Sequence, residues 1–117
     1  MKRVLIVDDE PDLLEVWSFA LEHVGYLVDR AHNGNAALTI LAAQLPDLIV
    51  TDLMMPGMDG AELCRLVRNN PEWAKVPILL HTSAHVAVTS SLLWNAVLRK
   101  PASMDAFLVT IANLTTR

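Results

Sequence analysis

Short apolar runs alternate with helix-like patterns along the whole chain. Residues 4–7 form a continuous and mostly β-branched run, which is typical of a strand covered on both faces. Similar short runs occur at residues 48–50, 78–80 and 96–98, whereas residues 26–31 mix apolar with charged side chains. The mixed pattern indicates a less buried strand at the edge of a sheet. The sequence therefore predicts five strands.

Apolar residues at helical spacing fill the intervals between these strands. A first helix is predicted from Pro11, whose missing N–H costs nothing in a first turn, to Gly25, which suits a helix C-terminus. Asn33 opens a second helix, and Asp59, with an acid three residues later, has the spacing of a capping box for a third. Ser103 is expected to cap the last helix.

The interval from residue 85 to residue 94 predicts the least regular of five expected helices. Residues 89–91 are threonine and serine, which are poor in helix interiors, so this fourth helix is expected to be short or irregular. Trp94 follows two leucines in the same interval. We leave open whether Trp94 packs into the core or forms part of a partner or dimer surface.

Five strands alternating with five helices predict a doubly wound α/β domain, with a parallel sheet covered by helices on both faces. A length of 117 residues suits one domain. We therefore expect a single domain over residues 1–117, with no output domain in this chain.

Composition and charge narrow the classes of function. A hydrophobic fraction of 53% and a charged fraction of 19% are typical of a soluble globular protein, and a net charge of −4 disfavours direct binding to nucleic acid or anionic membranes. The apolar run at the N-terminus is too short for a signal peptide or membrane span, so we expect a cytoplasmic location without membrane insertion. The single cysteine, Cys64, is interpreted as a buried structural thiol.

Polar residues follow four of the predicted strands, at the carboxyl ends where the crevice of such a sheet lies. Each has an ordinary structural explanation when taken alone, such as a helix start, a turn or a solvated charge. Their shared position favours a functional site. The residues are Asp8, Asp9 and Glu10 after the first strand, Asp52 after the third, Thr82 and Ser83 after the fourth, and Lys100 after the fifth.

Electrostatics indicate what such a site would bind. Carboxylates brought within ~5 Å of one another at an effective dielectric constant of ~20 repel by about 3 kcal/mol per pair. One lysine cannot offset three of them, whereas a hard divalent cation can, and Mg²⁺ typically combines one or two carboxylates with water and a phosphate. Carboxylates can also form acyl phosphates. The acids therefore predict a site for Mg²⁺ and a phosphoryl group.

Four motifs, in order, carry a family resemblance. They are Val-Asp-Asp-Glu at residues 7–10, Asp-x-x-Met-Pro-x-Met-Asp-Gly at residues 52–60, Thr-Ser-Ala at residues 82–84 and Lys-Pro at residues 100–101. Over essentially its whole length the chain resembles the receiver domain of the response regulators of two-component systems, including the chemotaxis regulators. The resemblance implies a flavodoxin-like sheet with strand order 2-1-3-4-5.

The resemblance also implies roles for individual residues. Asp52 would accept the phosphoryl group and contribute to the Mg²⁺ site. Asp9 would bind Mg²⁺ directly and Asp8 through water, with the backbone carbonyl of Met54 as a further ligand. The donor would be a phosphohistidine on a sensor histidine kinase or phosphotransfer protein, and the chain would catalyse only its own phosphorylation and dephosphorylation.

Lys100 would pair with the phosphoryl oxygens, and Thr82 would donate its hydroxyl to them in the active state. The added charge would change the surface of the fourth helix, fifth strand and fifth helix, which a downstream protein target would recognise. The resemblance makes Lys100–Pro101 a candidate for a cis peptide bond. Two departures are notable: Val97 stands where the family usually has an aromatic residue, and the interval from Thr82 to Lys100 is short.

Other functions were weighed. A receiver that binds partners without being phosphorylated is the main alternative, and a homodimer is possible. A phosphohydrolase with a nucleophilic aspartate and a flavodoxin-like electron carrier are disfavoured, since Leu53 and Met54 follow Asp52 and acids stand where a flavin phosphate loop would be. His81 and His85 flank the site but have no second ligand pair, so they are interpreted as non-metal residues.

Overall fold

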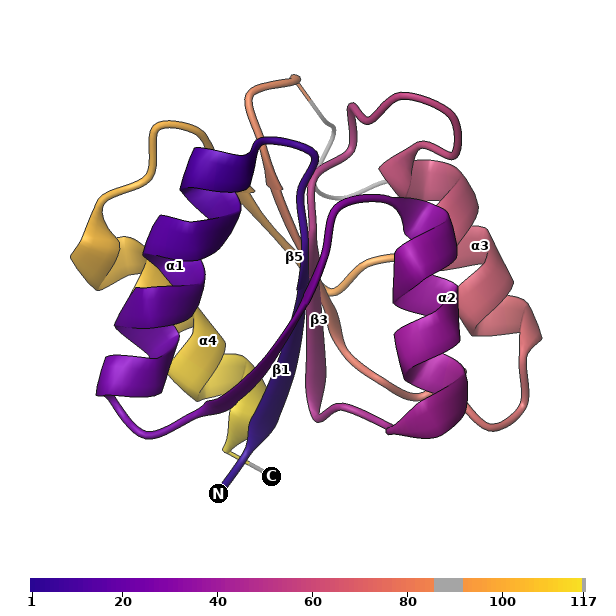
Figure 1. Cartoon of the computed structure of the whole chain (residues 1–117), viewed down its shortest axis with the longest axis horizontal. Helices are drawn as coiled ribbons and strands as arrows, with labels where there is room; N and C mark the ends of the chain where they lie inside the picture. Colours follow the sequence, from indigo (N-terminus) through magenta and orange to yellow (C-terminus); the bar gives the residue numbers. More distant parts are fainter. Residues whose placement is uncertain (86–91, 117) are drawn as a thin grey trace.

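The protein is described by a computed structural model that covers residues 1–85 and 92–116 (Figure 1). Five parallel strands form its central sheet in the order β2-β1-β3-β4-β5, which is the order that the resemblance implies. The predicted edge strand, β2, lies at one margin of the sheet. The strands are β1 (Arg3–Val7), β2 (Leu27–Ala31), β3 (Leu48–Thr51), β4 (Ile78–Thr82) and β5 (Ala96–Arg99).

Helices cover both faces of the sheet. In Figure 1, α1 and α4 lie on one face, and α2 and α3 lie on the other. They span α1 (Pro11–His23), α2 (Gly34–Ala43), α3 (Gly60–Asn69) and α4 (Met104–Thr115). No helix in the described residues is long and apolar enough to cross a membrane.

The prediction of five helices is corrected to four in the described part of the chain. Most of the helix expected over residues 85–94 falls on residues 86–91, which lie outside the described residues, and the described residues on either side are not helical. The serines and threonine of this interval, which are poor helix formers, had indicated an irregular segment. The helix numbered α4 here is therefore the one that the sequence analysis counted as the fifth.

The helix ends follow from local residue chemistry. Pro11 occupies the first turn of α1, and Gly25 follows that helix with a φ of 101°, a conformation that favours glycine. The predicted N-caps Asn33, Asp59 and Ser103 are confirmed, because each side chain accepts a hydrogen bond from the backbone N–H three residues later, at 2.8, 2.8 and 3.0 Å.

Two apolar layers hold the helices to the sheet. The layer under α2 and α3 is aliphatic, whereas the layer under α1 and α4 contains two buried aromatic rings, those of Trp17 and Phe107. Cys64 lies in the aliphatic layer, and burial raises the pKa of its thiol to about 12, which confirms a buried structural thiol. Because β1, β3 and β4 are covered on both faces, their carboxyl ends are fixed in position.

The stretch just before β5 is anchored by Arg68 of α3. Its guanidinium donates hydrogen bonds to the carbonyl of Leu93 and the side chain of Asn95, both at 3.0 Å. Trp94, between them, packs against the aliphatic layer, while Leu92 is 97% exposed. The packing of Trp94 agrees with the core alternative for this residue.

Candidate functional site

The two central strands place the first pair of acids. Val7 at the end of β1 is paired with Thr51 at the end of β3, so the next residue of each strand, Asp8 and Asp52, emerge side by side. The backbone N–H of Asp52 donates to the carbonyl of Val7 at 3.2 Å, which continues the ladder one step beyond the strands. Both side chains are buried, with exposed fractions of 6% for Asp8 and 7% for Asp52.

Lys100 joins this pair from the end of β5. Its Nζ donates to Oδ2 of Asp52 at 2.9 Å and to Oδ2 of Asp8 at 3.0 Å. The Lys100 backbone N–H donates to the carbonyl of Thr82 at 2.9 Å, which ties the start of the loop after β5 to the end of β4. The Lys100–Pro101 peptide bond is cis, as the resemblance implied.

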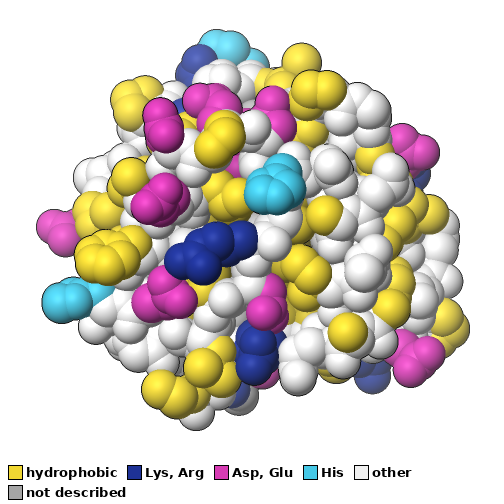
Figure 2. Space-filling model, in the orientation of Figure 1, with side chains coloured by type: hydrophobic (Ala, Val, Ile, Leu, Met, Phe, Trp, Pro, Cys, Tyr) yellow, Lys and Arg dark blue, Asp and Glu magenta, His cyan; other side chains and the backbone are white. Residues whose placement is uncertain are grey.

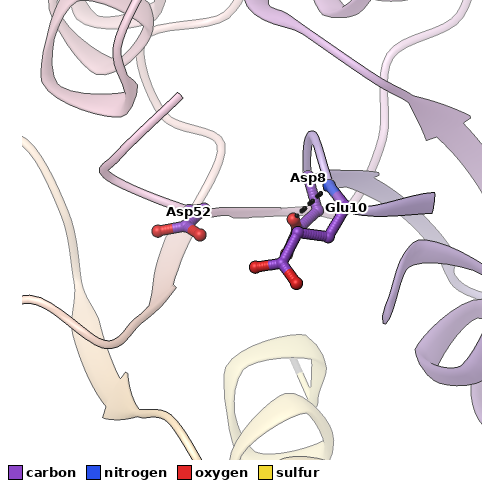
Figure 3. A group of neighbouring side chains, drawn as sticks. All are labelled: Asp8, Glu10 and Asp52. Carbon is purple, nitrogen blue, oxygen red and sulfur yellow. Dashed lines mark hydrogen bonds between the residues drawn. The ribbon is translucent and has the colours of Figure 1, made fainter. Parts of the chain in front are cut away.

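Glu10 completes the acidic group that the described residues form. One carboxylate oxygen each of Asp8, Glu10 and Asp52 lies within 4.8 Å of the other two, and Figure 3 shows Asp52 across a gap from Asp8 and Glu10. The backbone N–H of Glu10 donates to Oδ1 of Asp8 at 3.0 Å. Asp9, between them in the sequence, does not belong to this group among the described residues.

The ionisation of the site follows from these contacts. Burial alone would raise the pKa of Asp52, but hydrogen bonds from Lys100, Thr82 and the Met54 backbone lower it below its usual value. Burial alone would lower the pKa of Lys100, but its bonds to Asp52 and Asp8 raise it. Asp52 is therefore a carboxylate and Lys100 an ammonium at neutral pH.

Acidic side chains also gather along the upper edge of the molecule in Figure 2, where the strands end.

The loop after β3 packs closely beneath Asp52. The backbone N–H of Met54 donates to Oδ1 of Asp52 at 3.2 Å, and the N–H of Gly60 donates to the carbonyl of Leu53 at 2.8 Å. A Cβ on Gly60 would collide with the Asp52 carbonyl oxygen and with Cα of Leu53. The glycine of the Asp-Gly pair is therefore needed for the start of α3 to approach the backbone that carries Asp52.

Thr82 closes the site from β4. It is fully buried, its hydroxyl accepts a hydrogen bond from the Ala84 N–H at 3.2 Å, and it contributes to lowering the pKa of Asp52. Val97, on the neighbouring strand, is half-buried against the aliphatic layer.

His81 precedes Thr82 and faces the opposite, aromatic layer. Its ring lies 5.0 Å from that of Trp17, in an edge-on arrangement, and 5.2 Å from that of Phe107. Burial, with the nearby Lys100 charge, lowers the pKa of His81 to about 4, so the ring is neutral at neutral pH. The ring thus packs as a member of the aromatic layer, and its interpretation as a residue that binds no metal stays a prediction.

The structure brings together Asp8, Asp52, Thr82 and Lys100 as the strand-end pattern predicted. The roles assigned to Asp9 and to the Met54 carbonyl stay predictions, since the contact observed for Met54 involves its N–H. Glu10 was noted in the sequence as part of the acidic run but was not assigned to the metal site. The spacing of two residues between Asp8 and Glu10 could have indicated that Glu10 lies near the site. An aspartate side chain often accepts a hydrogen bond from the N–H two residues later, which forms a tight turn.

The donor set suits a hard divalent cation. Carboxylate oxygens from two strand ends and the first helix converge, and Mg²⁺ prefers such oxygen ligands. The ammonium group of Lys100 lies between Asp8 and Asp52 and offsets part of their negative charge. A bound cation would add the further positive charge that an incoming phosphoryl group requires.

The fold is a doubly wound α/β domain, and its site is an acidic crevice with one lysine at the carboxyl ends of the strands. The family model of the response regulator receiver domain matches residues 4–112, and the chain belongs to this family. It is thus a receiver domain of two-component signalling.

Solved structures agree with this assignment. The signal receiver domain of a histidine kinase from Syntrophus aciditrophicus is 31% identical, with 99% of this chain and 91% of that chain covered and a TM-score of 0.90. The chemotaxis response regulator CheY4 of Vibrio cholerae is 29% identical, with 97% and 98% covered and a TM-score of 0.90. The response regulator TrrA of Thermotoga maritima, solved with Mg²⁺-BeF, is 31% identical, with 97% and 99% covered and a TM-score of 0.85.

Proposed function

We propose that Asp52 accepts a phosphoryl group from a phosphohistidine on a sensor histidine kinase or phosphotransfer protein, in a Mg²⁺-dependent step. The observation that carries the proposal is the Asp52 carboxylate itself, which is buried yet held ionised by Lys100 at 2.9 Å. A buried carboxylate that stays charged and faces other acids is suited to nucleophilic attack on phosphorus. The solved relative with Mg²⁺-BeF supports the choice of cation.

The chain's own residues account for the transfer. An oxygen of Asp52 forms the new O–P bond as the P–N bond to the imidazole breaks, and the electron pair of that bond leaves with the imidazole. Lys100, already beside Asp52, then pairs with the phosphoryl oxygens, and the buried hydroxyl of Thr82 donates to them. Bound Mg²⁺ would supply charge stabilisation for the phosphoryl oxygens, held by Asp8, Asp52 and the ligands that the resemblance implies.

The proposed output follows from the added charge. A phosphoryl group on Asp52 carries roughly −1.5 to −2 charge at neutral pH and replaces a carboxylate of charge −1, so the site gains a net charge of roughly −0.5 to −1. Thr82 at the end of β4 and Lys100 just after β5 are the side chains that would respond to this charge, so the change is expected on the surface of β5 and α4. A downstream protein in the cytoplasm would recognise that surface. In this proposal the chain turns over no other substrate.

The test is phosphorylation of the purified protein by acetyl phosphate with Mg²⁺, followed by intact mass spectrometry. The wild-type protein is expected to gain one phosphoryl adduct, which chelation of Mg²⁺ by EDTA prevents. Asp52→Asn should gain none, while Asp12→Asn, which removes an exposed acid from the first turn of α1, should behave like wild type. A folded wild-type protein that takes no phosphoryl group would instead support the phosphorylation-independent receiver.

A further inference from the structure

We infer that the pocket between α1 and the loop after β5 binds a small, neutral aromatic ligand that carries a hydroxyl group. The pocket has a volume of about 340 Å³, and none of its lining residues is an acid. The proposed function gives it no role. Its wall is formed by three segments: Leu13 and Trp17 of α1, His81 and Ser83 at the end of β4, and Lys100, Pro101 and Ala102 after β5.

The size and the lining of the pocket indicate the shape of the ligand. Ligand pockets in proteins commonly have volumes of ~300–1,000 Å³, so this pocket lies at the lower end and suits a molecule of one or two rings. The rings of Trp17 and His81 stand edge-on, with their centroids 5.0 Å apart, and both belong to the wall. A planar aromatic ligand can pack against these rings and against the apolar side chains of Leu13 and Pro101.

Two buried nitrogen atoms of this wall lack hydrogen-bond partners. Nε1 of Trp17 and Nε2 of His81 have no partner within residues 1–85 and 92–116, although the two residues are only 8% and 3% exposed. Buried polar atoms in folded proteins are nearly always paired, so these two nitrogens point to a missing polar partner. Because both side chains line the pocket, a small rotation of either ring would present its nitrogen to a ligand.

The two nitrogens together favour a hydroxyl group as that partner. The indole N–H of Trp17 can only donate, whereas Nε2 of a neutral His81 ring donates or accepts according to its tautomer. A hydroxyl group both donates and accepts, so it can satisfy the two nitrogens in either tautomer. The charge of Lys100 is already paired with Asp8 and Asp52, so a ligand carboxylate would gain little from it. A neutral ligand is therefore favoured over an anion.

The test uses phenol as the probe, titrated into the ¹⁵N-labelled, unphosphorylated full chain and followed by two-dimensional NMR. Saturable shifts are expected for the backbone amides of Leu13 and Ala102 and for the indole N–H signal of Trp17. The indole N–H of Trp73 is the internal control, because this residue packs against the aliphatic layer and lies outside the pocket lining. An unshifted Trp17 signal, or equal shifts at Trp17 and Trp73, would overturn the inference.

Toluene separates hydrogen bonding from simple burial, since it has nearly the shape of phenol but carries a methyl group in place of the hydroxyl. Trp17→Phe removes the N–H and keeps an aromatic ring. It should therefore weaken the binding of phenol relative to that of toluene by about fivefold. Comparing the ratio of the two Kd values between the proteins cancels the different costs of removing the two compounds from water. The same ratio in wild type and Trp17→Phe would contradict a hydrogen-bonded hydroxyl.

A second pair of variants covers the case in which Trp17→Phe does not fold. Ala102→Leu enlarges a half-buried side chain of the wall and should weaken phenol binding about tenfold. Ala106→Leu, at an exposed position in the first turn of α4 and outside the lining, is the matched control and should bind phenol like wild type. Equal Kd values for phenol in these two variants would remove the site. The outcome is independent of phosphotransfer, because every titration uses unphosphorylated protein.

Discussion

The two sides of the site are built differently. The acidic side, with Asp8 and Asp52, extends from β1 and β3, whose residues are almost all buried. The cationic side, with Lys100, extends from β5, whose four residues are half-buried or exposed. β5 also carries Val97, at the position where the family resemblance implies an aromatic residue. The acceptor is thus fixed by the sheet, whereas its counter-charge sits on a less enclosed strand.

This difference suggests that the acidic side holds Asp52 in place and that the cationic side responds to its charge. A rigid frame under Asp52 keeps the nucleophile and the neighbouring acids in place whether or not a phosphoryl group is bound. Lys100 is held to the acids mainly by its two ion pairs, at 2.9 and 3.0 Å, so a new phosphoryl charge competes directly for it. In the proposed function, we therefore expect the cationic side to convert a change in charge at Asp52 into a change in structure.

The largest expected effect comes from removing the counter-charge. Lys100→Met leaves Asp8 and Asp52 buried and unpaired, so the free energy of unfolding at neutral pH should fall by about 2–4 kcal/mol. Added Mg²⁺ should restore part of the loss, because the ion binds only the folded acids. Urea unfolding with and without Mg²⁺ measures both effects. Lys75→Met, at an exposed position, is the control, and an equal loss there would remove the special role of Lys100.

A second effect concerns β4 and depends on pH. The pKa of His81 is lowered from 6.5 to about 4 by burial, so between these values the unfolded chain binds a proton that the folded protein excludes. Stability should therefore fall as the pH decreases from 6.5 toward 4, by up to about 3 kcal/mol from this residue. His81→Leu should flatten that part of the stability curve relative to wild type in urea melts at several pH values. Parallel curves for the two proteins would contradict the prediction.

A substitution at Gly60 tests the acidic side through the backbone that carries Asp52, without changing any charged side chain. Gly60→Ala places a Cβ against the carbonyl of Asp52 and should reduce the free energy of unfolding by about 2 kcal/mol. Phosphorylation should slow at the same time, because Asp52 shifts. Ala61→Gly, one residue later in the same turn, should cost at most about 1 kcal/mol and leave phosphorylation unchanged. Thermal unfolding and the rate of adduct formation distinguish the two.

The sequence predicted the features that depend on local chemistry or on sheet topology. Pro11, Asn33, Asp59 and Ser103 act through their own backbone neighbours, and each begins its helix as expected. Asp52 was placed correctly because the ends of parallel strands meet at one edge, whatever the details of packing.

Two features could not be predicted from local chemistry or sheet topology. The side of the chain to which Glu10 turns depends on a hydrogen bond between Asp8 and its own backbone, which periodicity does not report. The helix expected at residues 85–94 rested on weak propensities in a segment shorter than the family's usual one, and most of it lies outside the described residues. For Glu10, the orientation is set by a contact that leaves no repeating pattern in the sequence.

Locating the phosphoryl group is the most direct test of phosphotransfer to Asp52. After treatment with acetyl phosphate and Mg²⁺, reduction with borohydride converts an acyl-phosphorylated aspartate to homoserine, which peptide mass spectrometry can assign to one position. Mg²⁺-dependent phosphotransfer to Asp52 predicts homoserine at position 52 and at no other aspartate, and none when Mg²⁺ is withheld. Homoserine at position 8 or 9, or an equal yield without Mg²⁺, would contradict it.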